Sequence, residues 1–274
     1  SGVKPPLDLR IADPKNTNRT NGALEIRSAT SIRSDGAATK LHRAVAKSGA
    51  ITIEAWIKPG NTKQAGPARI VTLSKDSSNR NVTLGQEGDQ FEVRLRTAKT
   101  GSNGVPGIRT PGRTAAAQPT HIVFVRDRNG VARIYIDGKP KLDAKIAGRT
   151  HNWDGAMQLA LGNELSNDRP WLGTYYLVAI YDRALSEKEI AANFSAGSSA
   201  PGVSPPKKAD ISAALFDQKV AAILANNCLE CHDSATRKGK HVLSHKACAV
   251  AGKTNKLKAV LAMTGFKDRI IFAS

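Results

Sequence analysis

The sequence predicts a mainly β fold, an antiparallel two-sheet jelly-roll sandwich, followed by a small α-helical domain. Eight segments before residue 197 carry apolar residues in the pattern of buried or half-buried strands. All three cysteines lie in the last fifth of the 274-residue chain, which marks a separate chemical unit. A stretch rich in Ser, Pro and Gly separates the two parts. We therefore expect domains at 1–197 and 210–274, joined by a linker at 198–209.

The clearest predicted strand is ITIEAWI at residues 51–57. The other predicted strands are 69–73, 81–84, 91–96, 122–125, 133–136, 157–161 and 172–181. We expect each to bury one face. Asp137-Gly138 predicts a tight hairpin in which both turn residues have positive φ, and Asn129-Gly130 predicts a second such turn. The single helix signal is a capping-box pattern at residues 186–189.

The chain is strongly basic, with 41 Lys and Arg against 23 Asp and Glu and a net charge of +18. Residues 1–150 hold 26 basic and 12 acidic side chains, whereas residues 151–200 hold 3 and 6. Such a charge favours acidic partners. No finger, recognition-helix or aromatic RNA-binding signature accompanies it, so specific nucleic-acid binding is not expected. No apolar run approaches the roughly 18 residues of a membrane span, and no signal-peptide pattern opens the sequence.

Several stretches resemble the laminin-G-like, concanavalin-type jelly-roll family. They are ITIEAWIKPG, GPARIVTLSKDSSNRNVTLGQ, FEVRLRT, HIVFVRDRNGVARIYIDGK and RPWLGTYYLVAIYDRALSEKEIAANF, which cover about residues 45–197 in the order such domains use. The resemblance implies a module that binds glycans or proteins, often with a calcium ion at its rim. It does not identify the ligand.

The loop at residues 151–155, HNWDG, is the expected ligand contact of this domain. Trp153 is the candidate stacking platform, because an aromatic ring face packs against the C–H groups of a sugar. Asp154, Asn163 and Asp168 lie in the only acidic part of the domain and are the candidate ligand-binding oxygens, including for Ca²⁺. The two other tryptophans are expected in the core. A glycosidase is disfavoured, because no strand carries acidic residues at alternate positions.

The second domain carries the sequence CLECH at residues 228–232, preceded by a segment with helical apolar spacing. This is C-x-x-C-H, the attachment sequence for c-type haem, with Cys228 and Cys231 reaching the porphyrin edge and His232 ligating iron. Residues 210–255 resemble the planctomycete-type cytochrome c domain. The sequence therefore predicts one covalent haem c.

The same segment allows other readings. Cys228, Cys231, His241 and His245 approach a zinc pattern, although the nine-residue spacer is shorter than usual. A redox dithiol is a further alternative. Met263, His241 and His245 are the candidates for the sixth iron ligand. The resembling domains carry that Met in a Met-Pro-Pro stretch, which this sequence lacks. If neither Met263 nor one of the two histidines is the sixth ligand, the sixth coordination position of the iron is open or the domain is incomplete.

Together these features predict an exported electron-transfer protein, periplasmic or extracellular, that is not an enzyme. Its expected partners are a redox protein with an acidic surface and a glycan or anionic polysaccharide, and a homo-oligomer remains open. The alternative is an extracellular binding, structural or polymer-forming protein. In that case haem or zinc mainly stabilises the C-terminal domain.

Overall fold

The computed structural model describes residues 7–20, 22–197, 269–270 and 272–273. The chain divides into two compact units, one of Ser1–Pro205 with Ala259–Ser274 and one of Pro206–Lys258. The second unit lies wholly outside the described residues, and so does the C-x-x-C-H segment. The following description concerns the first unit.

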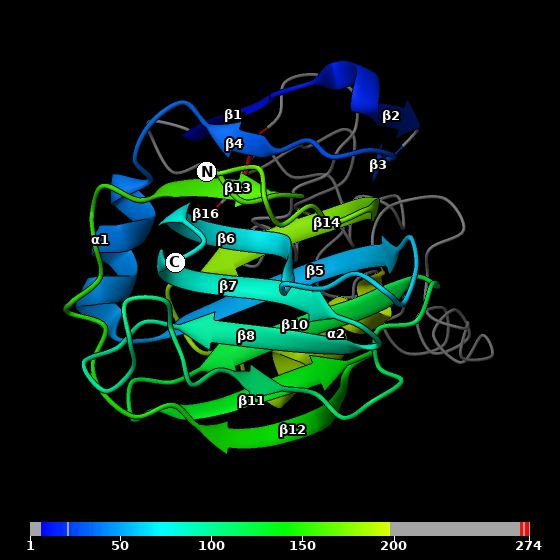
Figure 1. Cartoon of the computed structure of the whole chain (residues 1–274). Coiled ribbons are helices and arrows are strands. Elements are labelled where there is room, and N and C mark those ends of the chain that lie inside the picture. The colour runs from blue at the N-terminus through cyan, green and yellow to red at the C-terminus, as the bar shows by residue number, and fades with distance from the viewer. Residues whose placement is uncertain (1–6, 21, 198–268, 271, 274) are drawn as a thin grey trace, which may run out of the picture. The chain divides into compact units, whose positions relative to one another are not determined.

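Two antiparallel sheets form the sandwich, as predicted, and Figure 1 looks onto the first of them. This front sheet has the order β15-β1-β4-β13-β6-β7-β8-β9. Its strands are β1 Leu7–Ile11, β4 Ile32–Ser34, β6 Ala68–Asp76, β7 Asn79–Glu87, β8 Gln90–Leu95, β9 Ile108–Arg109, β13 Gln158–Leu161 and β15 Arg269–Ile270.

The back sheet lies behind it in Figure 1 and has the order β12-β11-β10-β5-β14-β3-β2, with β16 paired to β14. Its strands are β2 Thr17–Thr20, β3 Ala23–Ile26, β5 Ile51–Pro59, β10 Thr120–Arg126, β11 Val131–Ile136, β12 Lys139–Lys145, β14 Gly173–Tyr181 and β16 Phe272–Ala273. A short 3₁₀ turn, η1 Pro14–Asn16, precedes β2.

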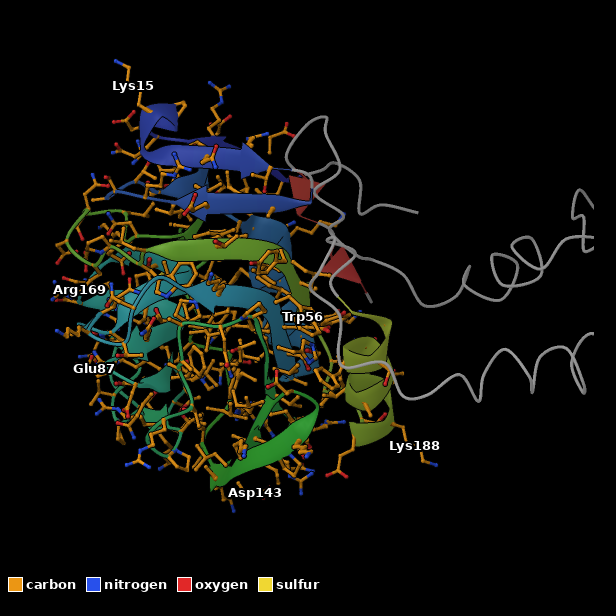
Figure 2. The ribbon with its side chains drawn as sticks, turned by 90° about the vertical axis from the view of Figure 1, so that its right-hand side faces the viewer. Lys15, Trp56, Glu87, Asp143, Arg169 and Lys188 are labelled. Carbon is orange, nitrogen blue, oxygen red and sulfur yellow. The ribbon has the colours of Figure 1, made fainter. Side chains whose placement is uncertain are left out.

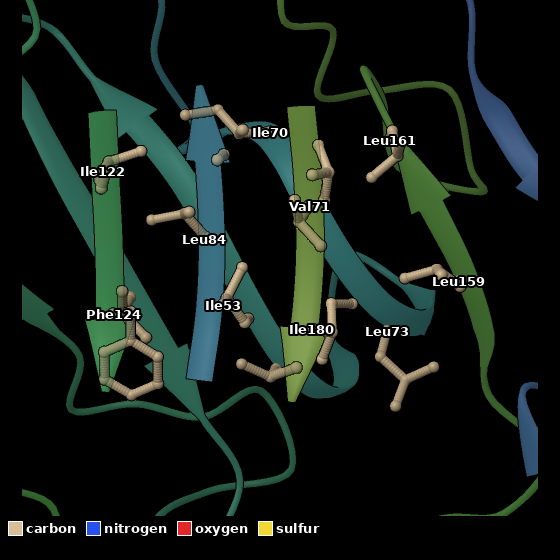
Figure 3. Close-up of a cluster of buried hydrophobic side chains, with 14 of the residues drawn as sticks. Ile53, Ile70, Val71, Leu73, Leu84, Ile122, Phe124, Leu159, Leu161 and Ile180 are labelled. Atoms are coloured by element: carbon tan, nitrogen blue, oxygen red, sulfur yellow. The ribbon is translucent and has the colours of Figure 1, made fainter. Parts of the chain in front are cut away.

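The hydrophobic core lies between the two sheets. Figure 3 shows Ile53, Phe124 and Ile180 of the back sheet meeting Leu84 and Leu159 of the front sheet. All five side chains are buried. Burial of each such side chain is worth roughly 1.5–3 kcal/mol, so the alternating strands are stabilised in one register only.

The back sheet also has a second, outer apolar layer, which the expectation of one buried face per strand did not include. Helix α2, Glu187–Ala196, covers this outer face. Trp56 of β5 stacks on Phe194 of the helix with ring centroids 5.6 Å apart, and Ile190 is completely buried. The described helices have ten residues each, and none is long and apolar enough to cross a membrane.

A carboxylate is buried beneath α2. Tyr181 Oη and Asn193 Nδ2 donate to Glu54 Oε2 at 2.8 and 2.9 Å, and His121 Nε2 lies 2.8 Å from Glu54 Oε1. Burial and the negative charge of Glu54 raise the pKa of Tyr181 well above its usual value. Glu54 therefore ties β5, β10, β14 and α2 together.

The predicted turns differ in detail. Asp137 and Gly138 have φ of 51° and 73°, which confirms the tight hairpin between β11 and β12. At the second turn only Gly130 has positive φ, because the Asp127 carboxylate accepts from the amides of Asn129 and residue 131 and holds a different turn.

One helix was not predicted. Helix α1, Thr39–Ser48, buries only Leu41 and Val45 and has no side-chain N-cap hydrogen bond, so the usual start signal is missing. It ends at Gly49, whose φ of 70° gives a left-handed C-cap.

Candidate ligand-binding face

On the outer side of the front sheet, side chains line up in rows, and the small ones of the middle strands, Thr72, Thr83 and Ala160, are completely buried. Antiparallel register partners share a face of the sheet, so the pairing places one residue from each of six adjacent strands in a single outward row. In strand order this row is Arg10, Arg33, Ala160, Thr72, Thr83 and Arg94. Small side chains thus occupy the middle of the row, with arginines on both sides.

A cavity of about 460 Å³ opens at one end of this row. It is lined by residues 10–12, residues 33–35 and Gln158. Arg10 Nε lies 2.9 Å from Asp35 Oδ2, and the two side chains are 78% and 51% exposed. Arg33 is exposed and has no ion-pair partner among the described residues. The cavity therefore has a positive lining with one exposed carboxylate.

Glu92 occupies the other end of the face. Its two oxygens lie 2.5 Å from Arg94 Nε and 2.5 Å from Arg109 Nη2. Because guanidinium groups contact both of its oxygens, the Glu92 carboxylate is not free to act as a general acid or base.

Between these ends lies a buried charged cluster. Arg69 Nε donates to Glu164 Oε2 at 2.8 Å, and both side chains are 0% exposed. Ser74 donates to the other oxygen of Glu164. Arg80, also 0% exposed, is the register partner of Ser74 on the neighbouring strand.

The pKa of Arg80 is lowered to about 10, chiefly by burial and then by the adjacent charge of Arg69, while the charge of Glu164 opposes the shift. Burial also lowers the pKa of Arg69, and the hydrogen bond that Arg69 donates to Glu164 opposes this shift. Both guanidinium groups remain protonated at neutral pH, so two cations and one carboxylate lie buried on this face.

The loop at residues 162–171 supplies Glu164 and is held by its own hydrogen bonds. Asn163 Oδ1 accepts from the amides of Glu164 and Arg169, both at 2.9 Å. Asp168 accepts from Ser166 Oγ at 2.6 Å and from Arg169 Nη1 at 2.8 Å. Partial burial would raise the pKa of Asp168, but these partners outweigh it and the pKa is lowered. Figure 2 shows Arg169 on the side of the molecule opposite α2.

The structure brings only part of the predicted oxygen cluster together. Asn163 and Asp168 share the 162–171 loop, but the Asp154 carboxylate turns back to accept from the amide of Ala156 at 2.9 Å. The backbone of Asp154 is fixed separately by Asn81. Within the described ranges no three His, Cys, Asp or Glu side chains converge as metal ligands. The described residues therefore provide no set of carboxylate ligands for the predicted calcium ion.

The expected exposed ring at Trp153 is corrected. The side chain is only 5% exposed and belongs to the main core, and its Nε1 donates to the carbonyl of Arg96 at 2.8 Å. A buried carbonyl 57 residues away satisfies the indole, so the ring face is unavailable for stacking on a sugar. Trp56 and Trp171 are buried, as expected.

The predicted haem residues lie outside the described part of the chain. These are Cys228, Cys231, His232, His241, His245 and Met263.

The sequence interpretation missed the arginines of the front face. Arg10 and Arg33 lie in short strands that precede the first predicted strand. Arg69 lies in a predicted strand and Arg80 immediately before one, where an arginine normally indicates a solvent-facing position. Alternation with core positions was an available signal for Arg10 and Arg33 only. Arg69 and Arg80 stand two positions from the core residues Val71 and Val82, and register shifts in the β6–β7 pair break the alternation there.

Comparison with known proteins agrees with this fold. The family model Laminin_G_3, the concanavalin A-like lectin/glucanases superfamily, matches residues 33–191. No curated protein matches the chain.

Solved structures show only distant likeness. A heptameric SAP-like pentraxin from Limulus polyphemus is 15% identical with a TM-score of 0.41, covering 52% of this chain and 68% of that one. Domain 4 of AbnA, a GH43 extracellular arabinanase from Geobacillus stearothermophilus solved with arabinotriose, is 21% identical with a TM-score of 0.47, covering 64% and 80%.

The binding domain of botulinum neurotoxin DC, solved with rat synaptotagmin II, is 14% identical with a TM-score of 0.48. The match covers 68% of this chain but only 46% of that domain. The family match covers more than half of the chain, and the structure shows two β-sheets there. The protein belongs to the concanavalin A-like lectin/glucanases superfamily.

Proposed function

We propose that the jelly-roll domain binds an anionic polysaccharide on the outer face of its front sheet. The observation that carries this proposal is the 460 Å³ cavity between Arg10 and Arg33. Its volume is within the roughly 300–1,000 Å³ of ordinary ligand sites. The family includes lectins, and the net charge of +18 favours an acidic polymer over a neutral one.

The local chemistry suits a carboxylate or sulfate group. A guanidinium fork matches two oxygens of such a group, and Arg33 is exposed for that contact. Arg10 is held by Asp35, but an exposed pair of this kind contributes only about 0–1 kcal/mol. An incoming anion can therefore displace Asp35 from Arg10 at little cost.

We further propose that the segment after residue 209 is a c-type haem domain that transfers single electrons, and that the jelly roll tethers it to the polysaccharide. Support comes from C-x-x-C-H: Cys228 and Cys231 would form the thioethers and His232 would ligate iron. When bound, the haem supplies a one-electron couple. Haem c attachment implies maturation outside the cytoplasm, so the proposed location is periplasmic or extracellular.

The proposed role is binding and electron transfer rather than catalysis. Glu92, the carboxylate of β8 at one end of the face, is engaged by two arginines. The alternative is a purely structural tail stapled by haem or zinc, which uses the same cysteines and His241 and His245.

The binding proposal is tested by titrating the full chain with polygalacturonate, chondroitin sulfate and neutral dextran. Arg10→Gln/Arg33→Gln should weaken binding of the acidic polymers at least tenfold. Lys139→Gln/Lys141→Gln, which removes the same charge from exposed positions of β12, should leave it nearly unchanged. Binding should also weaken with salt. Equal loss in both variants would refute the assigned face, and preference for dextran would refute the ligand class.

The haem proposal is tested on protein from its native source by a reduced-minus-oxidised spectrum and a pyridine haemochrome assay after acid-acetone extraction. A haem band that survives extraction, and that Cys228→Ser/Cys231→Ser abolishes, supports covalent attachment. Reversible oxidation and reduction without loss of fold then separates electron transfer from the structural alternative. A colourless protein with one zinc per chain would contradict the proposal.

A further inference from the structure

The buried cluster on the front face carries more positive than negative charge. Arg69 and Arg80 are both fully buried, and Glu164 is the single carboxylate that pairs with either of them within the described residues. An uncompensated buried charge costs several kcal/mol, so proteins normally pair it. The charges of Arg94 and Arg169 also act on Arg80, but each of these arginines has its own carboxylate, Glu92 or Asp168.

The two guanidinium groups share one neighbouring carboxylate, because Glu164 pairs with Arg69 and its charge also acts on Arg80. Glu164 accepts from Arg69 on one oxygen and from Ser74 on the other, and Ser74 is the cross-strand partner of Arg80. Arg80 uses its Nη2 to donate to the carbonyl of Ser77. Both arginines therefore lie on the same side of the β6–β7 hairpin, beside the same carboxylate.

Several buried donors of this cluster have no partner among the described residues. They are Arg69 Nη2, Arg80 Nε, Arg80 Nη1 and, in the adjoining loop, Asn163 Nδ2. All four atoms are nitrogen donors, and a guanidinium nitrogen cannot accept. Their common complement is an acceptor that brings negative charge and needs no donor in return. A water molecule could accept from these donors, but it brings no negative charge, and its own two hydrogens would also require acceptors.

We propose that Arg69 and Arg80 bind a buried, chloride-sized inorganic anion. One negative charge neutralises the excess left by Glu164, and a spherical ion accepts from several donors at once. The unpartnered atoms are sealed from solvent, so a polysaccharide substituent does not reach them and a small ion does so only through loop motion. This site is separate from the cavity at Arg10 and Arg33 and stands independently of it.

Bromide replaces chloride and scatters anomalously, so it locates the site directly. Crystals of the full chain soaked in sodium bromide should show an anomalous peak within about 3.5 Å of Arg69 Nη2 and an Arg80 nitrogen. A water without anomalous signal at that position would overturn the proposal, and so would bromide found only on the exposed surface.

A solution measurement is independent of crystallisation. At constant ionic strength, replacing sodium gluconate by sodium chloride should raise Tm by roughly 5–10 °C once chloride exceeds its Kd a hundredfold. Arg80→Gln should abolish this shift, whereas Arg133→Gln, at an exposed position, should retain it. If Arg80→Gln does not fold, the wild-type comparison decides. Identical Tm values in chloride and gluconate would contradict the proposal.

Discussion

Replacing Glu164 by Gln should destabilise the jelly roll strongly. Glu164 is the counter-charge of Arg69, and both side chains are completely buried. Removing one partner of a buried ion pair costs about 3–5 kcal/mol, because the other charge stays buried without compensation. At a urea slope of about 2 kcal/mol/M, the unfolding midpoint should fall by about 1.5–2.5 M. Fluorescence is a suitable readout, since Trp56, Trp153 and Trp171 are all buried in this domain.

The control for this prediction is Asp143→Asn. Asp143 also pairs with an arginine, with Arg133 Nε at 2.5 Å from its Oδ1, but both side chains are well exposed. Exposed pairs are screened by water and salt, so the midpoint should barely move. Equal midpoint losses in the two variants would refute the reasoning, since it rests on the difference in burial. A midpoint for Glu164→Gln within error of the wild type would refute it as well.

Three further predictions follow from described contacts. Ser186→Ala removes the capping box of α2 and should cost about 1 kcal/mol in urea unfolding; an unchanged midpoint would count against the cap. The pKa of Glu189 is lowered to about 2, chiefly by Arg183, so its stabilising contribution is complete above its unfolded pKa and disappears as the pH falls through about 2. The stability difference between wild type and Glu189→Gln should therefore stay constant from pH 6 to about pH 4.5 and shrink from there to pH 2.5, and a difference that is constant over the whole range would contradict this. Gly162→Ala should lower the midpoint, because φ is +79° and the new Cβ would lie 2.2 Å from Ile26 Cδ1.

Apolar alternation was sufficient to locate the central strands, because their burial leaves a period of two in the sequence. It failed at β2, whose residues Thr17–Thr20 are all polar, and at α1, which contacts the core through only Leu41 and Val45. These elements are stabilised by register pairing and by packing against distant strands. A local pattern carries no trace of such contacts.

The candidate site was harder to predict than the fold. Arg69 pairs with a carboxylate 95 residues away, and the indole of Trp153 is satisfied by a carbonyl 57 residues away. Such partners become neighbours only when the sandwich closes. Sequence reasoning therefore offered Trp153 as a candidate stacking platform and singled out neither Arg69 nor Arg80. The C-x-x-C-H motif is the opposite case, because its chemistry is local and is read directly from residues 228–232.

Hydrogen–deuterium exchange of the full chain at saturating hexagalacturonate tests the central claim most directly. The account predicts slower exchange at residues 7–12, 32–35 and 158–161, which line or adjoin the cavity, and unchanged exchange in α2 at Glu187–Ala196 on the opposite sheet. Slower exchange in α2 without any change at the cavity strands would contradict it. No change anywhere in the jelly roll at saturation would contradict it equally.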